Sequence, residues 1–406
     1  DNAGNRSKRH MQILAVLISI LVSFVLSMQG RKFITERGVR WSDDREYLSM
    51  AYNLYQYGVL SISRETGSPP HPSCHREPMV PWATALFMQL YPRYQSDWTL
   101  EEVLREGPPI KTIKYVNLIW VFLGLLGAWW ILRLLGANLL FCSLSVFLVY
   151  GLSSFYNTLD VLMAEIPAAA LLLWSGVLLL LAYEKKSWIF CGAAGVALGL
   201  LTLTKAVFYF VFFPIPFILM AFLFLQGVPR KQWLFMPILL CLGFGFVVYP
   251  YMYRNYNHFD QFKITDRGGR ILLIRAYKNN MTWTEIKGAV FHWAPRGYQP
   301  AIGKILGFSD ADLMRGGVLQ RLNRFSFVQD PEFEREERFA AANGSPEETI
   351  TLLLRAGAER IKAYNEFKAS GSANPAHDAD RYLQKQAIRM VKEKPFRHIL
   401  LTPLFF

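Results

Sequence analysis

Residues 113–135 read IKYVNLIWVFLGLLGAWWILRLL, and this stretch decides the class of the protein. About 20 consecutive apolar residues, each adding about 1.5 Å of helix, cross the ~30 Å hydrocarbon core of a bilayer. Further runs of similar length and character are found at residues 11–28, 139–155, 166–183, 188–203, 206–225 and 233–249. The sequence therefore predicts an all-α polytopic membrane protein with seven complete transmembrane helices.

The composition agrees with this class. The chain is 52% hydrophobic and 18% charged, whereas soluble domains carry about 25% charged residues. Its net charge of +13 comes without the spacings of zinc fingers, RNA-recognition segments or basic zippers, which argues against a nucleic-acid partner. We expect the excess positive charge to face membrane lipid headgroups or the phosphate of a lipid-linked substrate. The four cysteines do not have the spacing of metal ligands.

Alternating apolar and polar segments divide the chain into five parts. We expect these to be a cytoplasmic tail with the first transmembrane helix (1–29), a first outer loop (30–112), transmembrane helices two to seven (113–249), a second water-facing region (250–394) and the start of a further transmembrane helix (395–406). The first outer loop is predicted to be amphipathic. Helical periodicity around residues 346–368 and 378–393 predicts a mainly helical second region.

Charge in the short linkers predicts the sidedness of the chain. The linkers at 184–187 and 229–231 are basic, and the residues before the first span are basic too. The positive-inside rule places these segments in the cytoplasm and predicts an uncleaved signal anchor at the N-terminus. Residues 30–112 and 250–394 then share the extracytoplasmic face of a multi-pass cell membrane, for which a prokaryotic plasma membrane is the simplest assignment.

Charged residues gather at the outer ends of the predicted spans. Three of them are acidic: Asp43, Asp44 and Glu165. Three are basic: Arg76, Lys205 and Arg254. Taken singly, Glu165 could cap the fourth span, and an interfacial arginine usually reaches toward headgroups. Taken together, carboxylates that accept a proton and cations that neutralise a phosphate predict group transfer from a lipid phosphate at the membrane surface.

Five segments in chain order carry a family resemblance: Asp43–Tyr47, Arg76–Pro81, Met163–Pro167, Leu198–Lys205 and Tyr249–Tyr256. They resemble the motifs of the dolichyl-phosphate-mannose–protein mannosyltransferase-like family, which includes glycosyltransferase family 39 and bacterial aminoarabinose transferase-like enzymes. The resemblance implies the GT-C fold. It also implies an inverting glycosyltransferase that moves a sugar from a polyprenyl phosphate to an extracytoplasmic protein, lipid or glycan.

The resemblance also implies roles for the candidate residues. Asp43 corresponds to the catalytic base, Asp44 to a supporting acid and Glu165 to a residue that places the acceptor. The three basic residues then become candidates for binding the donor phosphate: Arg76, Lys205 and Arg254. Most enzymes that the chain resembles work without a metal ion, so no cofactor is predicted with certainty, and a divalent cation between Asp43, Asp44 and Glu165 is left open. The chain departs from the family where Asp44 replaces the usual glutamate and Lys205 the usual arginine.

Two other functions remain as alternatives. A chain with this fold could serve as a non-catalytic scaffold subunit of a larger membrane assembly, since fold does not fix function. It could also be a transporter, although transporters usually show internal repeats and ionisable residues at mid-membrane. Here the charges lie at span ends, which favours the transferase.

Overall fold

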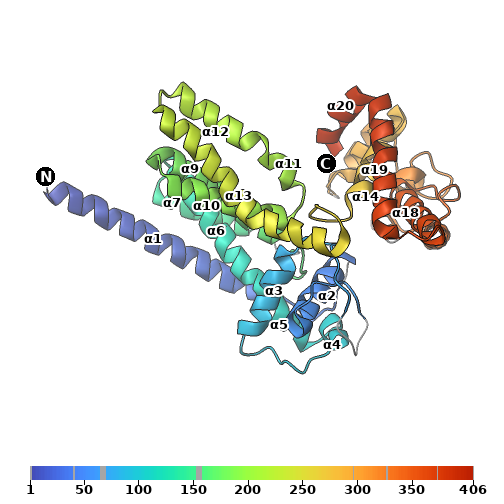
Figure 1. Cartoon of the computed structure of the whole chain (residues 1–406), viewed down its shortest axis with the longest axis horizontal. Coiled ribbons are helices and arrows are strands. Elements are labelled where there is room, and N and C mark those ends of the chain that lie inside the picture. Colours follow the sequence, from blue (N-terminus) through green and yellow to red (C-terminus); the bar gives the residue numbers. More distant parts are fainter. Residues whose placement is uncertain are drawn as a thin grey trace. The chain divides into compact units, whose positions relative to one another are not determined.

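The computed structural model describes residues 2–39, 42–64, 70–151, 158–295, 297–325, 328–372 and 374–405. Within these ranges every regular element is a helix, so the predicted all-α class is confirmed there. The chain divides into two compact units, Asp1–Thr265 and Asp266–Phe406 (Figure 1).

Five described helical segments are long and apolar enough to cross a membrane. They are Ile13–Phe33 in α1 (Asn2–Gly30) and η1 (Arg31–Phe33), Pro108–Leu134 in α5 (Pro108–Lys114) and α6 (Val116–Leu134), α9 (Glu165–Lys185), Phe208–Leu225 in α11 (Phe208–Phe212) and α12 (Pro214–Leu225), and α13 (Arg230–Phe259). This supports a helical membrane protein. The α13 helix continues past the predicted span end at residue 249.

Two of the seven predicted spans are described by helices shorter than the other five. The span predicted at 139–155 is described as α7 (Leu139–Tyr150, 12 residues), and residues 152–157 lie outside the described part. The span predicted at 188–203 is α10 (Trp188–Thr204, 17 residues), about 25 Å long at the usual helical rise. Left-handed Lys186 ends α9, and extended Lys205 ends α10. Among the described residues, five of the seven predicted spans are long and apolar enough to cross a membrane; α10 matches its predicted bounds but is shorter than these five, and the end of the 139–155 span is not described.

Glycines bring α10 into direct backbone contact with α13. A Cβ atom added at Gly195 would lie 2.1 Å from the Leu240 carbonyl oxygen, and one added at Gly243 would lie 2.3 Å from the Gly192 carbonyl oxygen. Small residues allow this approach in helix pairs of membrane proteins, where van der Waals packing drives association. The close packing fixes the position of α10 and therefore of Lys205, which follows its last residue.

The two basic linkers lie at the same end of the first unit. The Gln226 side-chain amide, after α12, donates a hydrogen bond to the Tyr183 hydroxyl near the end of α9. The Trp188 and Phe235 rings at the starts of α10 and α13 stack 6.3 Å apart. This agrees with the expectation that segments 184–187 and 229–231 share a membrane side; which side is cytoplasmic stays a prediction.

Short helices form the segment predicted as the first outer loop: α2 (Ser42–Tyr57), α3 (Met79–Leu90) and α4 (Leu100–Leu104). Leu48 and Met50 of α2 pack with Met88 of α3 and Ile110 of α5 in one buried cluster. The loop is therefore a folded layer whose apolar faces are buried. This layer positions the acidic motif at the start of α2.

The second unit is also helical. It contains α14 (Gly268–Asn279), α15 (Trp283–Trp293), α16 (Gln299–Leu306), η2 (Asp310–Leu313), η3 (Gln320–Leu322), α17 (Pro331–Ala342), α18 (Leu352–Ala369), α19 (Pro375–Glu393) and α20 (Pro395–Phe405).

Two of these helices match the helical periodicity of the sequence, α18 and α19. The α18 helix begins later than the predicted residue 346. The reason is that the Glu337 carboxylate accepts hydrogen bonds from the backbone N–H groups of Ile350 and Thr351. The α19 helix begins earlier than residue 378, capped by the Asn374 side chain. The expected start of a further span corresponds to α20, which has 11 residues.

Candidate active site

The acidic motif lies in the first turn of α2. Asp43 and Asp44 stand where the helix dipole favours negative charge. The Asp44 side chain is buried, whereas the Asp43 side chain is 39% exposed. The two carboxylates therefore occupy different environments, and Asp43 is the one that solvent or a ligand reaches.

The Arg76 guanidinium lies against one face of α2. Arg76 is 4% exposed, and its Nη2 and Nε atoms contact the carboxylates of Asp43 and Glu46. Its Cζ atom lies 5.4 Å from the centre of the Tyr47 ring. Burial disfavours the charge, but the hydrogen bond to Asp43 and the attraction of Glu46 outweigh it and raise the arginine pKa. The structure thus joins a predicted phosphate-binding residue to the predicted base.

Glu77 connects α2 to the junction of α10 and α11. Its Oε2 atom accepts a hydrogen bond from the Tyr47 hydroxyl at 3.2 Å, and its Oε1 atom accepts one from the Ala206 backbone N–H at 3.2 Å. Burial and the nearby Glu77 charge raise the Tyr47 pKa, so this hydroxyl stays protonated and donates. Glu77 therefore places the first outer loop next to Lys205.

Lys205 and Glu165 form the most accessible ion pair of the site. The Nζ atom of Lys205 lies 2.8 Å from Oε1 of Glu165, and the side chains are 36% and 46% exposed. Ala164 occupies the capping position of α9 and makes no side-chain cap, so Glu165 does not act as the N-cap residue considered from the sequence. The pair faces solvent, where a ligand can reach both charges.

Arg254 lies in α13 and contacts the loop that carries Arg76. Its Nη1 atom donates to the Ser73 carbonyl at 3.1 Å and to the Asn255 side-chain oxygen at 2.8 Å. The Tyr251 hydroxyl, one helical turn earlier, donates to the Arg76 carbonyl at 3.4 Å. These bonds hold the loop. They do not bring Arg254 to the acids, and its role in phosphate binding stays a prediction.

A buried ion pair that was not predicted from the sequence lies at the start of the first outer loop. The Lys114 Nζ atom lies 3.0 Å from Oδ1 of Asp160, and both side chains are buried. Asp160 also accepts hydrogen bonds from the Thr35 backbone N–H and hydroxyl, at 2.7 and 2.8 Å. Burial alone would raise the Asp160 pKa, but the bonds from Thr35 and Lys114 outweigh it and lower the pKa. The pair ties the start of the outer loop to α5 and to the segment before α9.

A small polar hollow lies beside Glu46. It has a volume of about 230 Å³ and is lined by Arg45, Ser49, Ile62 and Arg64 as well. Both arginines are exposed, and neither forms an ion pair with a carboxylate in the described part of the chain. Neither arginine was predicted from the sequence as a site residue. Arg45 could have been identified as a site residue because it directly follows Asp44 in the acidic motif.

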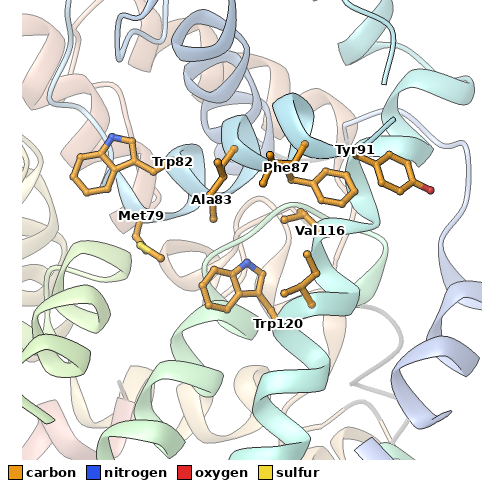
Figure 2. Close-up of a pocket in the computed structure, with 10 residues that line it drawn as sticks. Met79, Trp82, Ala83, Phe87, Tyr91, Val116 and Trp120 are labelled. Atoms are coloured by element: carbon orange, nitrogen blue, oxygen red, sulfur yellow. The ribbon is translucent and has the colours of Figure 1, made fainter. Parts of the chain in front are cut away.

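An apolar pocket of about 540 Å³ lies between α3 and α6. Figure 2 shows Met79, Trp82 and Phe87 of α3 above Trp120 of α6. Met79 is two residues after Glu77, so this pocket begins next to the acidic cluster.

Within the described ranges, no three histidine, cysteine or acidic side chains are grouped so that they could hold a metal ion. The structure therefore does not assemble Asp43, Asp44 and Glu165 into the divalent-cation site left open by the sequence. Comparison with known proteins shows no family: no family model matches the chain, and no curated protein is significantly similar to it. The function must therefore be inferred from the site itself.

Proposed function

We propose that the chain is a multi-pass membrane glycosyltransferase that moves a sugar from a polyprenyl phosphate to an acceptor outside the cytoplasm. The observation that carries the proposal is the exposed Lys205–Glu165 pair, which Glu77 connects to the Asp43–Arg76 pair. Glu165 and Lys205 lie at the ends of the apolar helices α9 and α10, where a lipid-linked donor would present its phosphate.

The proposed reaction is a single displacement. The acceptor hydroxyl oxygen attacks the anomeric carbon, and its proton passes to the Asp43 carboxylate. The bond between that carbon and the phosphate oxygen breaks, and the polyprenyl phosphate leaves with the bonding electrons. This inverts the anomeric centre. The contact with Arg76 holds the Asp43 carboxylate in place, so we assign Arg76 a positioning role in addition to the phosphate-binding role expected from the sequence.

The leaving phosphate needs accessible positive charge. Lys205 provides it with a 36% exposed side chain, and Arg45 and Arg64 provide more around the polar hollow. Arg254 already donates to a backbone carbonyl, so we expect its contribution to be smaller. Glu165, paired with Lys205, is placed to orient an acceptor hydroxyl.

A transfer assay on the purified full chain tests the proposal. Polyprenyl-phosphate donors with radiolabelled sugars are offered to the wild type, to Asp43→Asn and to Asp97→Asn. Asp97 is an exposed acid of the same loop and serves as the matched control. We expect wild type and Asp97→Asn to release labelled sugar, and Asp43→Asn to lose at least about a hundredfold in rate, the usual contribution of general base catalysis.

Two outcomes would contradict the proposal. Unchanged transfer by Asp43→Asn would remove Asp43 as the base. Absence of release from every donor by the wild type would favour the scaffold alternative, in which the fold holds a partner in a larger membrane assembly.

A further inference from the structure

The apolar pocket between α3 and α6 is large enough for part of a lipid. Its volume of about 540 Å³ lies within the ~300–1,000 Å³ typical of ligand sites. Its walls are almost entirely hydrocarbon, with Trp82 and Phe87 on one side and Trp120 on the other (Figure 2). Such a lining offers a hydrocarbon chain dispersion contacts but offers a polar ligand very few partners.

The lining residues also indicate how a ligand enters. Leu86, Leu90 and Ile119 line the pocket and have exposed side chains. Ile119 belongs to the apolar segment Pro108–Leu134, which is long enough to span a membrane. An opening edged by exposed leucine and isoleucine favours entry from the bilayer rather than from water.

A cation lies near the Tyr91 end of the pocket. The Tyr91 ring, which lines the pocket, lies 6.3 Å from the Tyr115 ring. The Arg31 Nε atom donates to the Tyr115 hydroxyl at 3.3 Å, and the Arg31 Cζ atom lies 5.2 Å from the ring centre. Arg31 is exposed at the end of the apolar segment Ile13–Phe33, and it forms no ion pair with a described carboxylate. An arginine at the end of a spanning helix is placed to bind a headgroup phosphate.

The Arg31 end is separate from the acidic cluster. The α3 helix has 12 residues, about 18 Å at the usual rise. Arg76 and Glu77 precede its first residue, whereas Tyr91 follows its last one. A lipid phosphate bound at Arg31 would therefore lie about one helix length from Asp43, too far to present a sugar to it.

We propose that this pocket binds a membrane phospholipid, with one acyl chain between α3 and α6 and its anionic headgroup phosphate on Arg31. The lipid fills the gap between the outer loop and the second transmembrane helix and so supports the layer that carries the acidic motif. The proposal does not depend on glycosyl transfer.

Native mass spectrometry of the full chain in mild detergent tests the site. The lipids offered are phosphatidylglycerol, phosphatidylcholine and a polyprenyl phosphate. Two variants address the two ends: Ala83→Leu fills the pocket, and Arg31→Gln removes the cation. Their matched controls are Ala169→Leu, on an exposed position of α9, and Arg93→Gln, an exposed arginine of the same loop.

We expect the wild type to retain phosphatidylglycerol through delipidation and to bind it more tightly than phosphatidylcholine. Ala83→Leu should lose it, and Arg31→Gln should bind it roughly tenfold more weakly, the usual effect of one lost charged hydrogen bond. Both controls should behave as the wild type. Retention by Ala83→Leu equal to that of the wild type would overturn the site. Loading with polyprenyl phosphate in place of phosphatidylglycerol would overturn the phospholipid and assign the pocket to the donor chain.

A second measurement uses the unmodified chain, so that it does not depend on a variant folding. Phosphatidylglycerol with a photoreactive group in its acyl chain is cross-linked, and the labelled peptides are identified. Labels in segment 79–91 or 116–120, removed by unlabelled phosphatidylglycerol, would support the pocket. Labels found only elsewhere would exclude it.

Discussion

The Nη2 atom of Arg76 contacts Oδ1 of Asp43, and this pair joins the loop before α3 to the first turn of α2. The arginine is buried and also contacts Glu46. Because one cation is shared by two carboxylates of the same helix face, its removal affects the loop and the proposed base together.

Arg76→Met should therefore destabilise the protein. Removing one partner of a buried ion pair costs about 3–5 kcal/mol, and the 39% exposure of Asp43 reduces the expected loss to about 2–3 kcal/mol. The midpoint of thermal unfolding in detergent measures it. Arg93→Met, at an exposed arginine of the same loop, should leave the midpoint almost unchanged. Equal midpoints for both variants would show that the Arg76 contacts contribute nothing to stability.

Gly195→Ala should separate α10 from α13. The new Cβ atom would lie 2.1 Å from the Leu240 carbonyl oxygen, so the two backbones must move apart. We expect a loss of about 1–3 kcal/mol, the usual cost of overpacking. Gly192→Ala in the same helix is the control, because no atom lies within 4 Å of its added Cβ, and alanine favours the helix. Unfolding midpoints that fall equally in both variants would contradict the close packing.

Hydropathy and local spacing predicted part of this structure. Glu165 and Lys205 were expected on one surface because they stand at the ends of neighbouring apolar runs, and the structure brings them to 2.8 Å. Glu46 and Tyr47 follow Asp43 by three and four residues, so a helical pattern places all three on one face. This spacing could have identified Glu46 as a partner of the site.

Other features depend on contacts between distant segments. Lys114 belongs to the predicted span 113–135, and its pairing with Asp160, 46 residues later, comes from tertiary packing that periodicity does not encode. The pairing of Arg76 with Asp43 is equally non-local. The bounds of α10, by contrast, were predicted to within one residue, because its apolar run ends at the charged Lys205.

His292 should make stability depend on pH. Burial and the positive charges of Arg324 and Lys278 lower the His292 pKa to about 4. The negative charge of Asp310 raises it, but by less. Between this value and the ordinary pKa of about 6.5 the unfolded chain binds a proton that the folded chain does not. His292 therefore does not reduce the free energy of unfolding above about pH 6.5, and this free energy falls as the pH decreases toward 4.

The expected loss between about pH 7 and about pH 5 is at most about 2 kcal/mol. Unfolding midpoints of wild type and His292→Gln, measured over this range, isolate the contribution, because other groups titrate in both proteins. The difference between the two midpoints should shrink or reverse as the pH falls. A difference that is constant with pH would mean that the His292 pKa is not depressed in the folded protein.

Lys205→Met separates a structural from a functional role for the exposed cation. An exposed ion pair such as Lys205–Glu165 contributes less than about 1 kcal/mol to folding, so the unfolding midpoint should hardly change. If Lys205 neutralises the leaving phosphate, transfer should fall by at least about a hundredfold, as for the loss of a preorganised charge-stabilising donor. Lys205→Arg should keep most of the activity because arginine also binds phosphate.

Lys362→Met is the matched control, since Lys362 forms an ion pair of similar length, 2.9 Å, with Glu347. It should change neither stability nor transfer. Glu165→Gln then tests the partner: if the acid orients the acceptor, this variant loses turnover while donor binding remains, whereas Lys205→Met weakens donor binding as well. Transfer retained by Lys205→Met would show that the phosphate is held elsewhere, and Arg45 and Arg64 beside the polar hollow would be the next positions to replace.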